Sequence, residues 1–420
     1  MPRRTSNRSL AGNISTDWLI IGAGYAGIAA ARRLAENEPD AAIVLVDACA
    51  VGEGASARNS GFVIDLPHNV GADLHDPDAQ LRALRLARAA KQHIDDLVKN
   101  HAIECQWSQQ GQMMGAKSKQ GEAVLDGFMQ GLDALNEPYT KMSATDLAAR
   151  TGSTYYTRAV HTPGTILMQP AALVRGLADC LPHDKIQVFE DTPVTNISYN
   201  DTITAQTPNG LITAHKVILA VNGFAPDLGH YKNALFNLQL YCSMTRPLTD
   251  AEHDSLGAPE NWGLVPSMAF GGPTIRYTMD RRLTMRSMFK HRHSGKASQS
   301  DYVAARRLQA QQIKDRFPQL PNDIITDTWM GQITLSQNFA PGFGQQADNV
   351  FTAVCQNGVG VTKGTISGLL AADLATGRDN PLLVDMLALG QPSKLPPRPF
   401  LDLGVNTKMK LWEFQQRHEA

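Results

Sequence analysis

The sequence predicts an α/β protein with a second lobe of mixed α+β character, and three observations support this fold class. The chain has 420 residues, which exceeds the usual length of one domain. Between residues 17 and 47, an apolar run, an Ala-rich stretch and a second apolar run follow one another, as in a βαβ unit. From residue 185 onward, short alternating segments are separated by turn residues, which is typical of antiparallel strands.

The elements near the N-terminus are predicted from the spacing of apolar residues. Residues 17–21 and 42–47 predict buried strands, and residues 25–37 between them predict a helix. Residues 79–101 carry apolar side chains near helical spacing and predict an amphipathic helix, which we expect to belong to the second lobe. Residues 1–16 are basic and lack an apolar core, so we expect a flexible arm there.

The later elements follow from turn signals. Between residues 185 and 221, Asp-Thr-Pro, Asn-Asp and Pro-Asn-Gly break the chain into short strands, which predicts tight hairpins. Alternating segments continue to about residue 325, and residues 301–317 predict a polar helix. Residues 348–377 predict a strand, a glycine turn and a helix that ends at Gly377.

Composition and charge exclude several classes of function. The formal net charge is −1, so the chain lacks the basic surface expected of a nucleic-acid-binding protein. We expect no transmembrane segment and no signal peptide, because no apolar run has the required length. The five cysteines lie far apart without a zinc-binding pattern, which indicates free thiols and no metal site. We therefore expect a cytoplasmic protein, and the sequence does not indicate its oligomeric state.

A glycine motif marks the junction between the first strand and the first helix. Gly22-x-Gly24-x-x-Gly27 follows a strand, opens a helix, and precedes an acid, Asp47, at the end of the next strand. The first glycine permits a tight turn, the second lets the backbone approach a pyrophosphate, and the third permits close helix packing. Asp47 is then expected to accept hydrogen bonds from the adenosine ribose. This context predicts a dinucleotide site but does not choose between NAD and FAD.

A second loop, GEGASARNSG at residues 52–61, follows Asp47 almost directly. Its small and hydrogen-bonding residues are unlike a core segment. FAD is long and needs contacts at its flavin end as well, so this loop favours FAD over NAD. A polar surface loop is the alternative interpretation.

This loop resembles the GaSgRNgG segment of the D-amino-acid-oxidase-like FAD-dependent oxidoreductase superfamily, and the chain is most similar to its γ-glutamylputrescine-oxidase-like amine oxidases. LMQP at 167–170, TPVTNI, ILAVNGF and TRPL also resemble family segments. The most specific match is WMGQITLSQNFAPGFGQQADNVFTAVCQNGVGVTKGTISG, which resembles the C-terminal flavin segment. The resemblance covers roughly residues 17 to 417.

The resemblance implies a glycine- or sarcosine-oxidase-like fold, in which a Rossmann-type FAD-binding domain is interleaved with a mixed-sheet substrate-binding domain. The implied FAD-binding domain comprises residues 17–62, 160–224 and 326–378. The substrate-binding domain comprises residues 63–159 and 225–325. Residues 379–420 form a C-terminal tail with a helix.

The resemblance and the two glycine motifs together define the expected FAD site. FAD is expected to be noncovalent, because neither a Cys nor a His matches the attachment positions of the family. The residues expected to contact FAD are Gly22, Gly24, Ala26, Gly27, Asp47, Ala48, Ser56, Arg58, Asn59, Ser60, Gly61, Val194, Asn222, Gly223, Gly358, Val359, Gly360, Val361 and Thr362.

The implied reaction is oxidation of a primary or secondary amine by hydride transfer to flavin N5, which gives an imine that water hydrolyses to a carbonyl. Dioxygen (O2) is the expected acceptor and is reduced to H2O2. One alternative is an amine or amino-acid dehydrogenase that passes electrons to a quinone or a flavoprotein. A second alternative, from another class, is a non-catalytic flavin-binding or assembly protein. The catalytic residues are unknown at this stage.

Two departures from the family pattern concern the substrate. The Arg that binds the carboxylate of amino acids in this family is missing after W-x-G, where Gln332 and its neighbours stand. In DRRLTMRSMF, Arg286 replaces a family glycine and shares a strand face with residues 284 and 288 if alternation holds. Arg286 is therefore a candidate anchor for a distal anionic group of the amine. A snorkelling Arg, or one paired with Asp280, is the alternative. Tyr277, Gln332 and Asn357 are further substrate-binding candidates.

Overall fold

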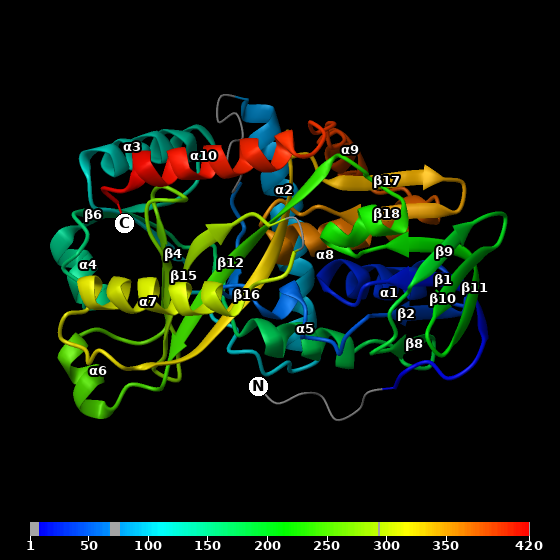
Figure 1. The fold of residues 1–420 in the computed structure, drawn as a ribbon, viewed down its shortest axis with the longest axis horizontal. Helices are drawn as coiled ribbons and strands as arrows, with labels where there is room; N and C mark the ends of the chain where they lie inside the picture. The colour runs from blue at the N-terminus through cyan, green and yellow to red at the C-terminus, as the bar shows by residue number, and fades with distance from the viewer. Residues whose placement is uncertain (1–7, 68–75, 293–294, 420) are drawn as a thin grey trace.

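The computed structural model describes residues 8–67, 76–292 and 295–419. It contains two lobes, each built around an eight-stranded sheet (Figure 1). The strands of the first sheet come from the beginning, the middle and the end of the chain, so the two lobes are interleaved in sequence. The predicted α/β fold with a second mixed sheet is confirmed.

The first sheet has the order β17-β18-β11-β1-β2-β8, and β9 and β10 extend it beside β11. Strands β18, β11, β1, β2 and β8 pair in parallel. Every residue of β2 and β18 is buried, as expected for parallel strands covered on both faces. The bounds are β1 Ile14–Ile21, β2 Ile43–Val46, β8 Ile186–Phe189, β9 Asn196–Tyr199, β10 Ile203–Thr207, β11 Gly210–Leu219, β17 Gly342–Ala347 and β18 Val350–Val354.

Five helices accompany this sheet and share one hydrophobic core with it. They are α1 Tyr25–Asn37, α2 Pro77–Asn100, α5 Pro170–Asp179, α8 Gly360–Ala375 and α9 Leu382–Leu387. The helices α1 and α8 approach closely, because a Cβ on Gly368 would lie 2.0 Å from the carbonyl oxygen of Ala26. Figure 1 shows α8 between the sheet of this lobe and the second lobe.

The second sheet has the order β16-β12-β15-β14-β13-β4-β6-β5 and is mainly antiparallel. Its strands are β4 Gln112–Ala116, β5 Thr140–Ser143, β6 Arg158–Thr162, β12 Leu235–Thr245, β13 Trp262–Pro266, β14 Thr274–Tyr277, β15 Leu283–Lys290 and β16 Ile325–Ser336. The helices of this lobe are α3 Lys119–Ala134, α4 Ala144–Thr151, α6 Asp250–Leu256, α7 Gln299–Arg316 and α10 Phe400–Gln416. Short elements complete the fold: β3 Phe62–Val63, β7 Ile166–Leu167, and the 3-10 turns η1 Ala55–Ala57 and η2 Asn222–Leu228.

The two faces of the second sheet have different partners. Ser287 of β15 donates a hydrogen bond to Gln312 of α7 over 2.7 Å, so its face packs against α7. Arg286, the preceding residue, points to the opposite face. The strand contains a bulge at Met288, where φ is +61°, and the register with β12 shifts there. Because of this bulge, Phe289 returns to the face of Arg286.

The structure differs from two expectations about where segments lie. The strand β1 begins at Ile14 and Leu10 is buried, so the described part of the expected arm over residues 1–16 belongs to the fold. Residues 1–7 lie outside the described residues. The helix α2, expected in the second lobe, packs mainly into the core of the first sheet beside α8, while its Leu84 packs with α3, β4 and β6 of the second lobe. In the C-terminal tail, the carboxylate of Glu419 accepts a hydrogen bond from the backbone N–H of Ser118 at the start of α3.

Among the described residues, no helix has both the length and the apolar character needed to cross a membrane.

Candidate active site

The first glycine turn depends on the absence of side chains. Gly22 has φ at +105°, and a Cβ there would lie 2.6 Å from the carbonyl oxygen of Ala220. A Cβ on Gly27 would lie 1.7 Å from the carbonyl oxygen of Gly22, and one on Gly24 would lie 2.7 Å from Ser56 Oγ. No side chain caps α1 through Gly24. The positive end of the helix therefore remains for an anion such as a pyrophosphate.

Asp47 at the end of β2 braces this turn. Its carboxylate accepts hydrogen bonds from the backbone N–H of Ala23 over 2.7 Å and of Cys49 over 2.9 Å. Burial raises the pKa of Asp47 despite these bonds. Each carboxylate oxygen can accept a further bond, so the predicted ribose contact remains open to it. The backbone of Thr192 donates to the carbonyl of Asp47 and brings the segment with Val194 beside it.

The second loop, residues 52–61, contacts both lobes. It is partly exposed, because Gly54, Ala55 and Arg58 lie at the surface while Gly61 is buried. Ser56 Oγ accepts a long hydrogen bond from the N–H of Tyr25 at the start of α1. Asn59 donates to the carbonyl of Ser56 over 2.7 Å and accepts from the N–H of Gly61 over 2.8 Å. The Asn59 amide thus shapes the loop itself. Its predicted contact with FAD stays a prediction, as do those of Ala48 and Ser60 beside it.

Three contacts attach this loop to the second sheet. Arg58 Nη1 donates to the carbonyl of Met330 over 3.2 Å, and Trp329 Nε1 donates to the carbonyl of Arg58 over 3.1 Å. Buried Arg276 on β14 donates through Nη1 to the carbonyls of Gly61 over 2.9 Å and Met168 over 2.6 Å. Burial lowers the pKa of Arg276 to about 10. Because of these contacts, β16 and β14 hold the loop beside one face of the second sheet.

Sequence reasoning missed Arg276. The signal was available, because Arg276 stands between Ile275 and Tyr277 in an otherwise apolar strand. Both neighbours point to the hydrophobic core under α7. An Arg that alternates with core residues must point to the other face, where only a polar partner makes its burial tolerable.

The turn between β18 and α8 is the second backbone cradle. Gly358 has φ at +84°, and no side chain caps α8 through Val359. The hydroxyl of Thr362 is buried in the first turn of α8 without a hydrogen-bond partner in the described structure. Burial lowers the pKa of Lys363, the next residue, to about 8. An orphaned hydroxyl and an uncapped helix end fit the polar edge of a bound flavin, as predicted for Gly358, Val359, Gly360, Val361 and Thr362.

Asn222 and Gly223 join the cradle to the second sheet. Asn222 Oδ1 accepts a hydrogen bond from the N–H of Cys355 over 3.1 Å. A Cβ on Gly223 would lie 2.3 Å from Asn237 Oδ1 and from Thr334 Oγ1. Asn222 and Gly223 therefore hold the segment after β11 close to the end of β18 and to β12. Their contact with FAD stays a prediction.

Arg286 lies on the sheet face that contacts the second loop, residues 52–61. It pairs across the sheet with Cys242 and with Thr274, and its guanidinium donates to Thr274 Oγ1. Within the described chain, no carboxylate lies within 4 Å of this guanidinium, and burial lowers its pKa. The alternative partner Asp280 instead pairs with Arg282 over 3.1 Å. Arg286 is thus a half-buried cation to which the described residues give no charged partner.

The strand β16 presents an apolar residue to the same face. Ile333 pairs with Leu238, which shares its face of β12 with Cys242. Ile333 Cδ1 would lie 3.9 Å from a Cβ on Gly358. On this face, β16 thus presents the apolar Ile333, and the guanidinium of Arg286 lies on β15, two strands away in the sheet.

The other three substrate candidates do not join Arg286. Gln332 pairs with Gln239, which accepts a hydrogen bond from Tyr241 on the α7 face. Tyr277 lies in the core under α7, and its hydroxyl meets His253 Nδ1 at 2.9 Å. The strand register places both side chains on the α7 face of the sheet, opposite Arg286. The local sequence could not show this, because the face depends on the pairing partners.

Asn357 faces backbone groups instead of a cavity. Its Nδ2 donates to the carbonyls of Phe339 over 2.8 Å and Ala340 over 3.2 Å, and its Oδ1 accepts from the N–H of Ser336. Because donor and acceptor atoms are both engaged, this amide shapes the turn and is not available for a substrate.

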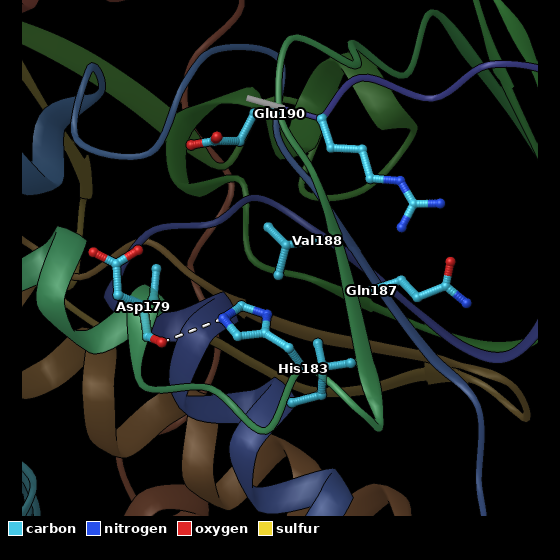
Figure 2. Close-up of a pocket in the computed structure, with 8 residues that line it drawn as sticks. Asp179, His183, Gln187, Val188 and Glu190 are labelled. Atoms are coloured by element: carbon cyan, nitrogen blue, oxygen red, sulfur yellow. Dashed lines mark hydrogen bonds between the residues drawn. The ribbon is translucent and has the colours of Figure 1, made fainter. Parts of the chain in front are cut away.

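A cavity of about 330 Å³ lies at the free edge of β8, lined by residues that include Arg8, His183 and Glu190 (Figure 2). His183 Nε2 contacts the carbonyl of Asp179 at the end of α5. None of the residues predicted to contact FAD lines this cavity. We therefore do not assign it to the active site.

Comparisons with known proteins agree with this geometry. The chain is 24% identical over 415 residues to the probable oxidoreductase OrdL of Haemophilus influenzae, which covers 96% of this chain and 92% of that protein. It is 26% identical over 375 residues to the γ-glutamylputrescine oxidoreductase of Escherichia coli, with 87% and 84% covered. The crystal structure of glycine oxidase from Geobacillus kaustophilus superposes with a TM-score of 0.76 at 17% identity, covering 91% of this chain and all of that one.

A family model described as DAO, FAD dependent oxidoreductase, matches residues 17–374. This range contains both glycine turns, the loop at residues 52–61 and most of the second sheet. The chain therefore belongs to the DAO family of FAD-dependent oxidoreductases and uses FAD as its cofactor.

Proposed function

We propose that this enzyme oxidises an amine that carries a distal anionic group, at the carbon next to the nitrogen. The names of two similar proteins, a γ-glutamylputrescine oxidoreductase and a glycine oxidase, support an amine substrate. The observation that carries the proposal is the half-buried guanidinium of Arg286, which lies on the sheet face of Arg276 and has no carboxylate partner in the described structure. Partial burial of an unpaired charge is costly, as the lowered pKa of Arg286 indicates, and an anionic substrate group would give this residue a partner.

FAD, when bound, accepts a hydride from the substrate carbon and so supplies the redox chemistry. The chain contributes orientation and electrostatics. The uncapped start of α8 directs positive charge toward the space beside Ile333, where it stabilises negative charge that develops during the reaction. Arg276 and Arg58 hold the second loop against the sheet and so fix the distance between the cofactor cradle and Arg286.

The finer features of the proposal concern attachment, acceptor and location. The FAD is noncovalent, because neither a Cys nor a His of this sequence matches the attachment positions of the family. Dioxygen is the acceptor and is reduced to hydrogen peroxide, and a quinone or a flavoprotein is the alternative. The free thiols support a reducing, cytoplasmic location.

The test uses the purified, FAD-loaded protein mixed without air with matched pairs of amines. Each pair differs only in the anion: γ-aminobutyrate against n-butylamine, and aminoethylphosphonate against ethylamine. We expect the flavin to bleach faster with the anionic member of a pair. Equal rates within each pair would overturn the role of the anion, and absence of bleaching with every amine would favour a non-catalytic flavin-binding protein.

Admitting air then tests the acceptor. If dioxygen is the acceptor, the yellow colour returns within one turnover and peroxide accumulates. If the flavin stays bleached until a soluble quinone is added, the enzyme is a dehydrogenase. Acid precipitation of the same sample is expected to release FAD into the supernatant, whereas flavin in the pellet would contradict noncovalent binding.

A further inference from the structure

The helix α10 covers the same sheet face that carries Arg286. Met409 and Val405 of its inner side pack with Leu238 and Leu240 of β12. Asp402 accepts a hydrogen bond from buried His291 at the end of β15 over 2.7 Å. Figure 1 shows α10 lying lengthwise along one edge of the second lobe. The inner side of the helix is therefore fully engaged by the fold.

The outer side of α10 is also apolar, although it faces solvent. At 100° per residue, four large apolar residues lie on the side of the helix opposite Met409. We call these four residues the outer stripe. The outer stripe consists of Phe400, Leu403, Leu411 and Phe414, which are 68%, 68%, 51% and 63% exposed. A surface helix normally has a polar outer side, so a second apolar stripe indicates a partner.

The charges beside the outer stripe identify the kind of partner. Three exposed cations flank the stripe on its two sides: Lys408, Lys410 and Arg417. The two carboxylates of the helix lie elsewhere, because Asp402 points to His291 and Glu413 stands on the flank next to the inner side. Arg417 also lies over the Phe414 ring at 4.0 Å. The outer half of α10 is thus apolar and cationic.

This combination disfavours a second copy of the chain. Two copies that met through α10 would bring like charges together, which opposes association. An anionic lipid surface instead provides phosphate groups for the cations and an apolar layer for the stripe, as for amphipathic helices that lie in the membrane interface.

We propose that α10 docks this enzyme onto anionic lipid membranes. The outer stripe enters the boundary between headgroups and acyl chains, and the three cations contact lipid phosphates. The helix lies in the plane of the interface and does not cross it. This docking is independent of the proposed amine oxidation, because the outer stripe points away from the sheet face of Arg286.

The test is co-sedimentation of the FAD-loaded full chain with vesicles of phosphatidylcholine alone and with vesicles that also contain phosphatidylglycerol. We expect binding to the anionic vesicles, weaker binding to neutral ones, and loss of binding at high salt. The double variant Leu403→Gln and Phe414→Gln should bind at least about tenfold less, because it removes half of the stripe while Gln preserves helix propensity.

Two further variants make the result specific. Lys408→Gln with Lys410→Gln should weaken binding to anionic vesicles and reduce its salt dependence. The matched control is Val303→Gln on α7. Val303 is 60% exposed, and this variant should bind like the original chain. All variants should retain FAD and bleach with amines at the original rate, which separates this test from the proposed function.

Three outcomes would overturn the proposal. The original chain could fail to bind either kind of vesicle, or the stripe variant could bind as well as the original. Sedimentation velocity could also show a concentration-dependent dimer that only the stripe variant abolishes, in which case the occupant of the outer stripe is a second copy.

Discussion

The glycine turns of the first sheet and the Arg286 face of the second sheet form their sites in different ways. At Gly22–Gly27 and Gly358–Thr362, the groups predicted to face the cofactor are backbone atoms and helix ends. On the second sheet, the groups proposed to face the substrate are side chains of β14, β15 and β16. Backbone sites are encoded by residues adjacent in sequence, whereas the side-chain site depends on strand pairing and on a bulge.

The largest effect tests the backbone site. Gly27→Ala places a Cβ 1.7 Å from the carbonyl oxygen of Gly22. Because this oxygen belongs to the backbone, the turn or the helix must shift to relieve the clash. We expect loss of bound FAD and a destabilisation of about 1–3 kcal/mol or more. The measurements are the flavin-to-protein ratio after gel filtration and the thermal midpoint.

Gly131→Ala on α3 is the matched control, because no atom lies within 4 Å of its added Cβ. It should keep FAD fully and gain about 0.8–1 kcal/mol of stability from helix propensity. If Gly27→Ala retains FAD as well as this control does, the turn is not shaped by the close approach described above.

The second effect tests the side-chain site. Arg286→Met removes a charge-assisted contact with the anionic group, which is worth about 1.5–3 kcal/mol. We expect kcat/KM for γ-aminobutyrate to fall roughly 10- to 100-fold, with n-butylamine unaffected. Steady-state or stopped-flow kinetics with both amines measure the difference.

Stability separates this role from a structural one. Because the described structure gives Arg286 no carboxylate partner, Arg286→Met should leave the thermal midpoint unchanged or raise it. Arg286→Lys should recover part of the activity with the anionic amine. A clear loss of stability, with both amines affected equally, would contradict an anchor.

A third effect should change stability without changing substrate binding. Asn357→Asp places a carboxylate against the carbonyls of Phe339 and Ala340, to which the amide now donates. We expect a loss of about 1–3 kcal/mol in denaturant unfolding. The KM for the amine should stay the same. A rise in KM without loss of stability would instead indicate that Asn357 contacts the substrate.

The smallest effect concerns the ion pair between Arg246 and Glu252, at one end of the second sheet. Two hydrogen bonds from Arg246 lower the pKa of Glu252 from 4.5 to about 2. A lowered carboxylate pKa stabilises the fold above the unfolded value and loses that contribution as pH falls from 4.5 toward 2. Solvent screens this pair, so the contribution is about 1 kcal/mol. Unfolding of Glu252→Gln should show a shallower pH dependence in that range, and an identical slope would contradict the pairing.

The two glycine-turn units of the first sheet were predictable to within a few residues, whereas the predicted FAD-binding segment 326–378 includes β16, which belongs to the second sheet. The helix Tyr25–Asn37 has the predicted bounds, and the strand, turn and helix around Gly358 also agree. Local hydrophobic periods and glycine spacing determine such units, because each contains its own turn and helix start. The helix α2 was predicted in the second lobe but contacts the cores of both lobes, because an apolar stripe predicts that a helix packs without identifying its partners.

The substrate face was only partly predictable. Alternation along β15 correctly separated Arg286 from Ser287. Gln332, Tyr277 and Asn357 carry suitable side chains, but pairing with Gln239, burial under α7 and contacts with backbone carbonyls remove them from the site. Arg276 has no local motif, and its role appears only where its strand meets Gly61 and Met168.

From the order of amino acids alone follow the fold class, the two backbone cradles and the choice of FAD, because those features arise within short stretches of chain. The partners of Arg286, the face of Gln332 and the outer stripe of α10 were decided only by the tertiary structure. The physical reason is that a side chain acquires a function from the groups packed around it. In this protein those groups come from strands and helices that are distant in sequence.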